Sequence, residues 1–176
     1  MFARTRPKHI TTTVTHLVMV DPPTLELGWG DTNITFTEDK KPDLETYRLV
    51  YNAVGRRHHW VNRRYMPDYS LQRLLHHPDN RVFYLRRNTD IIGFTEVNTR
   101  QHPEIELVFV GLVEEMLGLG LGKKLLHHTL DIIWAEQPEK VNIQTNTLDH
   151  PNALRLYQKV GFKPVSQEDV TIIDRG

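Results

Sequence analysis

Apolar and polar positions along the chain form runs that predict strands and helices in mixed order. Alternating or β-branched runs predict strands over residues 9–20, 33–37, 81–86, 91–98, 104–113 and 141–146, with one or two more after residue 162. Apolar residues at helical spacing predict helices over residues 42–55, 70–77, 120–135 and 149–161. Because no repeat, low-complexity tract or linker interrupts this pattern, we expect a single domain over residues 1–176, with a flexible segment at residues 1–8.

One stretch leads from a buried strand into a helix through regularly spaced glycines. The strand ends near Val113, Gly118, Gly120 and Gly122 follow at every second position, and apolar residues from Leu121 onward recur at helical spacing. Glycine lets a backbone approach a ligand closely, and free N–H groups at a helix N-terminus, together with the helix dipole, favour an anion. The stretch therefore predicts a pyrophosphate-binding loop.

Two common phosphate-binding motifs do not fit the spacing of these glycines. A P-loop needs a glycine at the position of Leu117 and a hydroxyl residue at the position of Lys124. A dinucleotide-binding loop needs its third glycine at the position of Lys123. A glycine-rich turn that serves only tight helix–strand packing remains an alternative when the loop is taken alone.

The composition narrows the classes of function. The 22 basic and 22 acidic residues balance, so no overall field draws the chain to nucleic acid or to an anionic membrane. The chain has no cysteine, which excludes thiolate chemistry and fits a reducing compartment. Its apolar runs are shorter than the roughly 20 residues of a membrane helix, and residues 1–14 lack the apolar stretch of a signal peptide. We expect a cytoplasmic protein without a nucleic-acid or membrane partner.

Two motifs together resemble the GNAT superfamily of N-acetyltransferases. The loop from Leu117 to Gly122 is similar to the acyl-CoA motif of that family, in which Arg or Gln precedes the glycines and a helix follows. The segment ALRLYQKVGF, from Ala153 to Phe162, resembles the family pattern A-x-x-L-Y-x-x-x-G-F. The resemblance covers residues 33–165. It implies the α+β GNAT fold, a central mixed, mostly antiparallel, twisted sheet of six to seven strands flanked by about four helices.

The resemblance also implies a site for acetyl-CoA, the acetyl donor, between two diverging strands. The residues expected to bind it are Leu112, Val113, Gly118, Leu119, Gly120, Leu121, Gly122, Lys123 and Asn152. The chain departs from the family pattern at Leu117, where Arg or Gln is usual, and at His150, where Asn often opens the second motif. The side-chain contacts to acetyl-CoA therefore stay open.

Three residues are candidates for the chemistry of acetyl transfer. A primary ammonium has a pKa near 10, so at pH 7 only about one amine in 10³ is nucleophilic and a base must take its proton. Glu104 and Glu106 lie two residues apart on one strand, face the same side, and are both candidates for that base. The resemblance implies that Tyr157 protonates the departing thiolate. The alternatives are strand-end carboxylates in solvent and a core tyrosine.

Residues 56–66, with the sequence RRHHWVNRRYM, concentrate basic and aromatic side chains between two predicted helices. One interpretation is a solvated loop with Trp60 tucked into the core. The other is a loop or helix over a substrate pocket, with the aromatic side chains as walls and the arginines for an anionic group. The predicted substrate-binding residues are Trp60, Tyr65, Glu96 and Glu106.

The identity of the acceptor rests on resemblance. The segments YRLVYNAVGRRHHWVNRRYM, EIELVFVGL and TLDHPNAL resemble a GNAT branch that includes kasugamycin 2′-N-acetyltransferases. That resemblance implies a small-molecule amine, an amino-sugar antibiotic of the aminoglycoside kind, and a role in antibiotic resistance. Polyamines, amino acids and protein N-termini remain open as acceptors. The family further implies a homodimer.

Two alternatives are not enzymes, and no metal is expected. A CoA-binding module without catalysis is favoured by Leu117. A nucleic-acid-binding protein would use a cluster of four arginines, Arg56, Arg57, Arg63 and Arg64. Three pairs of adjacent histidines point in different directions on a helix and chelate poorly, and no H-E-x-x-H motif is present, so we predict no metal site.

Overall fold

The computed structural model describes residues 6–176; residues 1–5, which belong to the segment expected to be flexible, lie outside the described residues. The strands are β1 (Lys8–Met19), β2 (Ile34–Asp39), β3 (Asn80–Arg87), β4 (Asp90–Asn98), β5 (Glu104–Leu112), β6 (Lys140–Asn146) and β7 (Lys163–Asp174). The helices are α1 (Leu44–Gly55), α2 (Asp68–Leu75), α3 (Leu121–Ala135) and α4 (Ala153–Val160), with short 3-10 turns at Arg56–His58 and Glu114–Met116. The predicted elements are all present, although Lys8 already belongs to β1.

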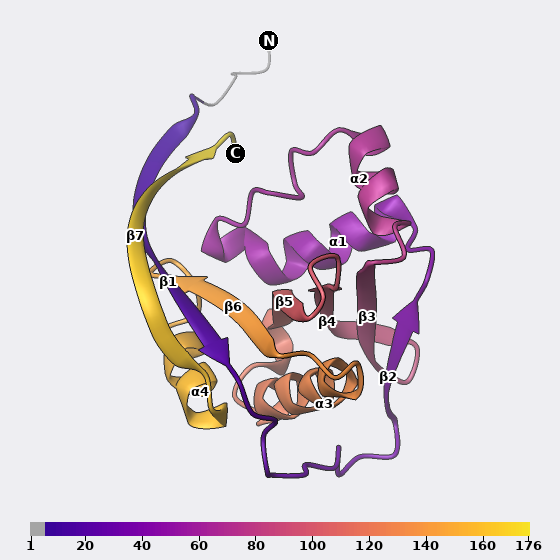
Figure 1. The fold of residues 1–176 in the computed structure, drawn as a ribbon. Coiled ribbons are helices and arrows are strands. Elements are labelled where there is room, and N and C mark those ends of the chain that lie inside the picture. The colour runs from indigo at the N-terminus through magenta and orange to yellow at the C-terminus, as the bar shows by residue number, and fades with distance from the viewer. Residues whose placement is uncertain (1–5) are drawn as a thin grey trace.

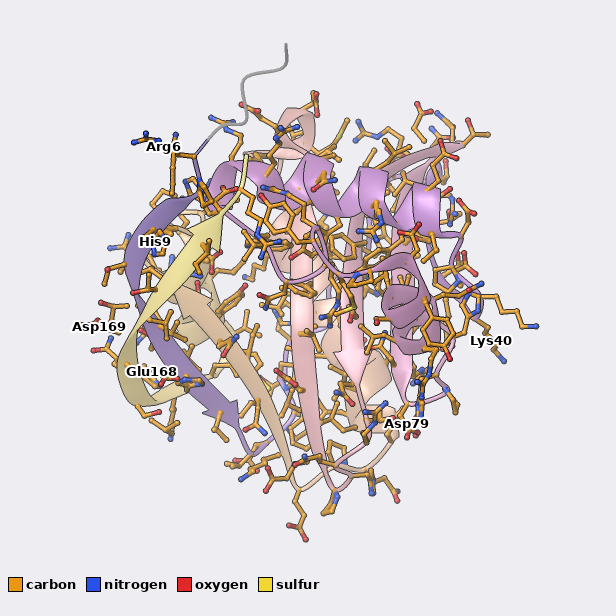
Figure 2. All side chains as sticks on the ribbon, turned by 90° about the horizontal axis from the view of Figure 1, so that it is seen from above. Arg6, His9, Lys40, Asp79, Glu168 and Asp169 are labelled. Atoms are coloured by element: carbon orange, nitrogen blue, oxygen red, sulfur yellow. The ribbon has the colours of Figure 1, made fainter. Side chains whose placement is uncertain are left out.

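The seven strands form one sheet in the order β2-β3-β4-β5-β6-β1-β7. Neighbouring strands are antiparallel except for β5 and β6, which are parallel. The first strand of the chain lies between β6 and the last strand, so the two ends of the chain are neighbours along much of β7 (Figure 1). Figure 2 labels Glu168 and Asp169 on β7 at one edge of the sheet and Lys40, just after β2, at the other. The mixed, mostly antiparallel sheet flanked by four helices confirms the predicted fold.

The helices cover both faces of the sheet (Figure 1). On one face, α1 and α2 bury an aromatic cluster that includes Tyr47, Tyr51 and Phe94. On the other face, α3 and α4 pack on the apolar side chains of β1, β5 and β6, among them Leu107 and Ile143. No helix within residues 6–176 is long and apolar enough to cross a membrane.

The parallel pair at the centre of the sheet separates partway along its length. β5 and β6 are paired only over residues 104–107 and 140–143. A bulge in β5 then leaves Val108 without a partner on β4, and such a bulge bends a strand and increases its twist. Beyond this point β5 stays paired with β4 and β6 stays paired with β1. The two strands therefore diverge and leave a gap in the sheet.

Candidate active site

A cleft of about 560 Å³ opens between the diverging ends of β5 and β6. Residues 107–112 of β5 form one wall and residues 143–146 of β6 the other. Trp60, from the loop after α1, lines the same cleft, as do Leu117 beside the glycine loop and Tyr157 of α4. The fold thus brings segments from the middle and the end of the chain around one cavity.

The glycine loop has a backbone that requires glycine at two positions. Gly118 and Gly120 have φ angles of 77° and 76°, in the left-handed region that side chains rarely adopt. A Cβ atom at either position would meet no atom within 4 Å, so the space beside the loop is open. Gly120 is the first residue before α3, and no side chain caps that helix. Uncapped N–H groups beside open space fit an anionic group such as the pyrophosphate of acetyl-CoA.

The other predicted donor-binding residues differ in how they meet the cleft. Leu112 faces Gly93 of β4, and the Val113 N–H donates to the Ile92 carbonyl at 2.9 Å. Leu112 and Gly93 therefore form a non-hydrogen-bonded pair, and the Leu112 N–H and C=O point away from β4 towards the cleft. The N–H of Val113 is already engaged. The contact of Val113 with acetyl-CoA stays a prediction.

The side chains around the glycine loop are exposed. Leu119 and Lys123 both face solvent. A Cβ at Gly122, within the first turn of α3, would make only an ordinary contact with Leu112 Cδ1 at 3.8 Å, so packing does not require glycine there. Leu121 is buried and anchors the helix in the core.

Sequence reasoning missed the segment before β2. Trp29 stacks on His128 of α3, with ring centroids 4.2 Å apart and planes 10° from parallel. The Lys124 Nζ donates to the Trp29 carbonyl at 2.6 Å. The segment therefore packs beside the glycine loop and occupies Lys124. Only the isolated aromatic residue in a polar stretch could have indicated this contact.

Tyr157 belongs both to the core and to the cleft. Its side chain is 8% exposed, and its ring packs edge-on against Phe162 with centroids 6.2 Å apart. Burial, reinforced by the charge of Asp149, raises the pKa of its hydroxyl well above the ordinary value of 10. The hydroxyl therefore stays protonated at neutral pH and is able to donate a proton or hydrogen bond within the cleft.

The two candidate bases have different surroundings. Glu104 begins β5 and lies away from the cleft, with Oε1 2.8 Å from the Lys140 Nζ and Oε2 accepting from Asn142 at 3.4 Å. The hydrogen bond with Lys140 lowers the pKa of Glu104, which makes it a poorer base. Glu106 immediately precedes Leu107, the first cleft residue of β5. Neither carboxylate lines the cleft itself, but Glu106 lies at its closed end.

Glu106 is reached by solvent, yet enough protein surrounds it to change its acidity. Desolvation raises the pKa of its carboxyl above the ordinary value of 4.5. The charge of Arg63 opposes this rise, that of Glu96 adds to it, and that of His16 opposes it. The raised pKa makes this carboxylate a stronger base than an ordinary glutamate.

Glu96 is fully buried and is fully engaged by protein groups. Arg63 donates to its Oε1 through Nη2 at 2.7 Å and through Nε at 3.3 Å, and the Tyr47 hydroxyl donates a short hydrogen bond to Oε2. No surface of this carboxylate is left for a substrate. The prediction that Glu96 binds the acceptor is therefore corrected: it anchors the loop after α1.

Trp60 is a wall of the cleft, and its indole is tied to the opposite side. The Trp60 Nε1 donates to Asp149 Oδ1 at 2.9 Å. Asp149 Oδ2 accepts from the Thr145 hydroxyl at 2.7 Å and from the Asn146 N–H at 2.9 Å. The last helix, predicted from residue 149, begins only at residue 153, so Asp149 precedes it and its carboxylate serves the cleft.

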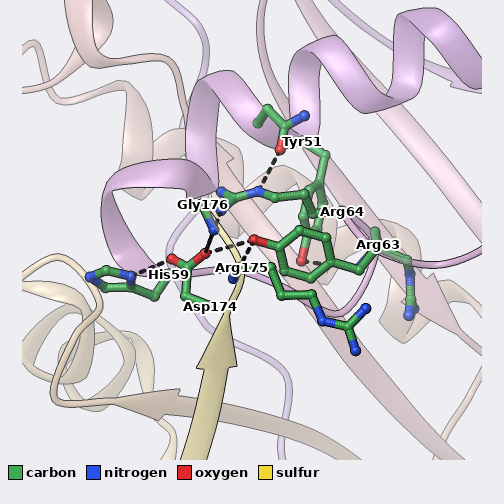
Figure 3. A network of polar contacts seen from close by, with 9 residues as sticks. Tyr51, His59, Arg63, Arg64, Asp174, Arg175 and Gly176 are labelled. Carbon is green, nitrogen blue, oxygen red and sulfur yellow. Dashed lines mark hydrogen bonds and ion pairs between the residues drawn. The ribbon is translucent and has the colours of Figure 1, made fainter. Parts of the chain in front are cut away.

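Tyr65 does not line the cleft and, together with His59, joins the loop after α1 to Asp174 near the end of the chain; Figure 3 shows the contact of His59 with Asp174. Its hydroxyl donates to Asp174 Oδ1 at 2.6 Å, and the His59 Nδ1 lies 2.7 Å from Oδ2. These hydrogen bonds, from Tyr65 and then from His59, hold the pKa of Asp174 well below its usual range. The predicted substrate contact of Tyr65 is corrected to a structural one. Sequence reasoning missed Asp174 because more than a hundred residues separate it from the loop.

The arginine cluster is largely paired within the molecule. Its ion-pair partners are Glu114 for Arg57, Glu96 for Arg63 and Asp174 for Arg64. The positive charge that this cluster would offer to nucleic acid is thus mostly neutralised.

Asn152 lies at the start of α4 on the surface and does not line the cleft, whereas its neighbours Pro151 and Ala153 do. Its side chain makes no capping hydrogen bond. Within residues 6–176 no group of three or more histidine, aspartate or glutamate side chains is placed to hold a metal ion.

A parallel strand pair that splays beside a helix with an uncapped, glycine-lined N-terminus defines a class of acyltransferases that bind acyl-CoA. Residues 47–162 match the Acetyltransferase (GNAT) family, and the chain belongs to this family. No curated protein matches the chain.

Solved structures share the fold at low sequence identity. An aminoglycoside acetyltransferase from an uncultured soil metagenomic sample, in complex with trehalose, has a TM-score of 0.61 and 19% identity, covering 74% of this chain and 89% of that one. A GCN5-related N-acetyltransferase from Sphaerobacter thermophilus has a TM-score of 0.62 and 17% identity, and the match covers 96% of this chain and 53% of that one. A conserved protein of unknown function from Staphylococcus epidermidis has a TM-score of 0.61 and 13% identity, and the match covers 95% of this chain and 63% of that one. The chain spans less than two thirds of the last two.

Proposed function

We propose that the protein transfers the acetyl group of acetyl-CoA to a primary amine of a small cationic molecule, an amino-sugar antibiotic being the preferred acceptor. The observation that carries this proposal is one cleft lined by the protonated Tyr157 hydroxyl and by Leu117, which adjoins the open glycine loop, with the Glu106 carboxylate directly before Leu107, the first cleft residue of β5. These are the groups that acyl transfer to an amine needs.

The donor site uses backbone groups. The N–H groups from Gly118 to Lys123 hold the pyrophosphate, and the N–H and C=O of Leu112 face the pantetheine. Backbone donors make a charged side chain at Leu117 dispensable. Acetyl-CoA, when bound, supplies the acetyl group as an activated thioester.

Tyr157 and Glu106 handle the protons. Tyr157 keeps its proton at neutral pH and donates it, or a hydrogen bond, to the leaving sulfur. Glu106 accepts the proton that the acceptor ammonium must lose, directly or through a water. Glu104 is paired with Lys140, so we assign the role of the base to Glu106 and not to Glu104.

The acceptor class is supported by charge and by similarity. Asn142 of β6 lies opposite Glu106 in the sheet, and the charge of His16 on β1 acts on Glu106. His16 itself pairs with Glu168, its Nε2 2.9 Å from the Glu168 Oε1. Such a surface suits an amine-bearing sugar with several hydroxyl groups. The soil aminoglycoside acetyltransferase, also solved in complex with sisomicin, has the same fold with a TM-score of 0.60. Kasugamycin is the acceptor that the sequence resemblance favours.

The test is the release of the CoA thiol over a panel of amines. The panel holds kasugamycin, sisomicin, spermidine, free amino acids and a peptide with a free N-terminus. We expect turnover with an amino sugar at the highest kcat/KM. Turnover with peptides alone would refute the small-molecule acceptor, and calorimetric binding of CoA without turnover on any amine would indicate a CoA-binding module. The proposed homodimer is checked by sedimentation.

A further inference from the structure

Arg63 and Glu96 form an ion pair buried beneath the loop after α1. Glu96 is 0% exposed and the Arg63 side chain 13%, and Nη2 lies 2.7 Å from Oε1. The second oxygen of Glu96 accepts from Tyr47 of α1, and the backbone N–H of Arg63 donates to the Tyr51 hydroxyl at 3.3 Å. The pair thus joins α1, the loop and β4 at one point.

That point lies beside the closed end of the cleft. Glu96 is opposite Phe109, the first residue of β5 after the bulge, and the Arg63 guanidinium lies 5.2 Å from the centre of the Phe109 ring. The extra residue at Val108 puts Phe109 on the same face of β5 as Glu106. Arg63 therefore lies over the strand face that carries the proposed base.

We propose that Arg63 and Glu96 act as one positioning unit for the transfer reaction. The pair holds the loop after α1 on the sheet and balances the charge beside Glu106. The proposal rests on the proposed function, in which Glu106 is the base. The unit acts through Glu106 and through Trp60, three residues before Arg63 in the same loop.

The charges that face Glu106 determine the sign of the effect. Arg63 from the loop favours the ionised carboxylate, Glu96 from β4 disfavours it, and His16 from β1 favours it. The remaining charged groups nearby are themselves paired, Glu104 with Lys140 and Glu168 with His16. Removal of Glu96 leaves the effect of the Arg63 charge on Glu106 unbalanced, whereas removal of Arg63 leaves the effect of the Glu96 charge unopposed by Arg63.

The test compares the pH dependence of kcat/KM in Glu96→Gln and Arg63→Gln. The acid limb, which reports the base of the free enzyme, moves to lower pH in Glu96→Gln and to higher pH in Arg63→Gln. In both variants kcat/KM at the optimum falls about 10- to 100-fold, because the loop loses its anchor. A purely structural pair would lower activity without shifting the two limbs in opposite directions.

Asp174→Asn is the matched control. It weakens the contacts of His59, Tyr65 and Arg64 and so loosens the same loop, but the charge of Asp174 is not among those that act on Glu106. We expect a raised acceptor KM and an unshifted acid limb. Should the charge variants fail to fold, Tyr47→Phe removes the hydroxyl that supports Glu96 and keeps both charges, and an unchanged acceptor KM there overturns the positioning role.

Glu106→Gln separates the two proposals. Suppose that Glu106→Gln abolishes the acid limb of kcat/KM, while Glu96→Gln and Arg63→Gln keep that limb at the same pH as in the parent. The positioning unit is then refuted, and Glu106 remains the base. If Glu106→Gln keeps the limb, the assignment of Glu106 as base fails first.

Discussion

The Trp60 Nε1 donates a 2.9 Å hydrogen bond to Oδ1 of Asp149 and so joins the loop after α1 to the loop before α4. The His58 ring nitrogen and the Leu148 carbonyl, 3.0 Å apart, connect the same two loops. Since both loops line the cleft between β5 and β6, these bonds tie the two sides of the cleft together. The shape of the cleft therefore depends on contacts between segments about 90 residues apart.

Trp60→Phe tests this connection. The ring packing against Phe109 is largely kept, but Asp149 loses one of three donors, and a hydrogen bond to a charged group contributes about 1.5 kcal/mol or more. We expect the free energy of unfolding to fall by about that amount and the KM for acetyl-CoA to rise, as measured by urea denaturation and initial rates. Trp134→Phe is the control, because the Trp134 Nε1 has no partner among residues 6–176. An equal loss in both variants would contradict a specific role for the Trp60 bond.

The glycine loop is tested by alanine at two of its positions. Gly120→Ala forces a side chain into the left-handed region, at a cost of about 1–2 kcal/mol, and shifts the N–H groups at the start of α3. CoA affinity, measured by calorimetry, should fall at least tenfold. Gly122→Ala introduces only an ordinary contact with Leu112 and should bind CoA nearly as well as the parent. Equal affinities for all three proteins would refute the loop as the pyrophosphate site.

Tyr157→Phe removes the proposed acid and keeps the packing of the ring on Phe162. We expect kcat to fall about 100-fold, with little change in the KM values or in the melting temperature, because the lost interaction acts on the leaving thiolate. The decisive measurement is steady-state kinetics with both substrates varied. Turnover at the parent rate would leave Tyr157 a core residue only.

Glu106→Gln should slow turnover and stabilise the fold. The folded state raises the pKa of Glu106, so its protonated form contributes stability at low pH that is lost as the pH rises through the folded pKa. Above that pH the ionised carboxylate disfavours folding relative to glutamine. Between pH 4 and 8, the melting temperature of the variant relative to that of the parent should increase as the pH rises.

Glu104→Gln is the control with the opposite sign. In the parent, Lys140 lowers the pKa of Glu104. The ionised form of Glu104 therefore contributes stability above the ordinary pKa of 4.5, and this stability is lost as the pH falls through the lower pKa of the folded state. The variant should melt slightly below the parent at neutral pH. Parallel curves for both glutamine variants would contradict the assigned environments.

The elements of the fold were predictable because local periodicity determines them. The helix α1 begins after Asp43, whose side chain accepts from the Thr46 N–H at 2.9 Å, and ends at Gly55 as expected. The glycine loop was likewise readable, since φ angles near 76° at Gly118 and Gly120 require the residue type that the sequence shows.

The candidate site was predictable only where the motif itself carried the information. Tyr157 lies within a recognisable pattern, and it lines the cleft. Glu96 and Tyr65 were assigned to the substrate from their residue type, but their partners Arg63 and Asp174 come from other elements. Nothing in the local sequence distinguishes a carboxylate that meets solvent from one that meets a buried guanidinium.

The sequence by itself thus determined the order of strands and helices, the glycine-lined start of α3 and the family resemblance, because these depend on residues close together in the chain. The tertiary structure alone decided that β1 is inserted beside β6, that β5 and β6 diverge at Val108, and that Glu106 rather than Glu104 is left beside the cleft. Pairing between distant strands and the neutralisation of one charge by another depend on three-dimensional proximity, which local sequence patterns do not encode.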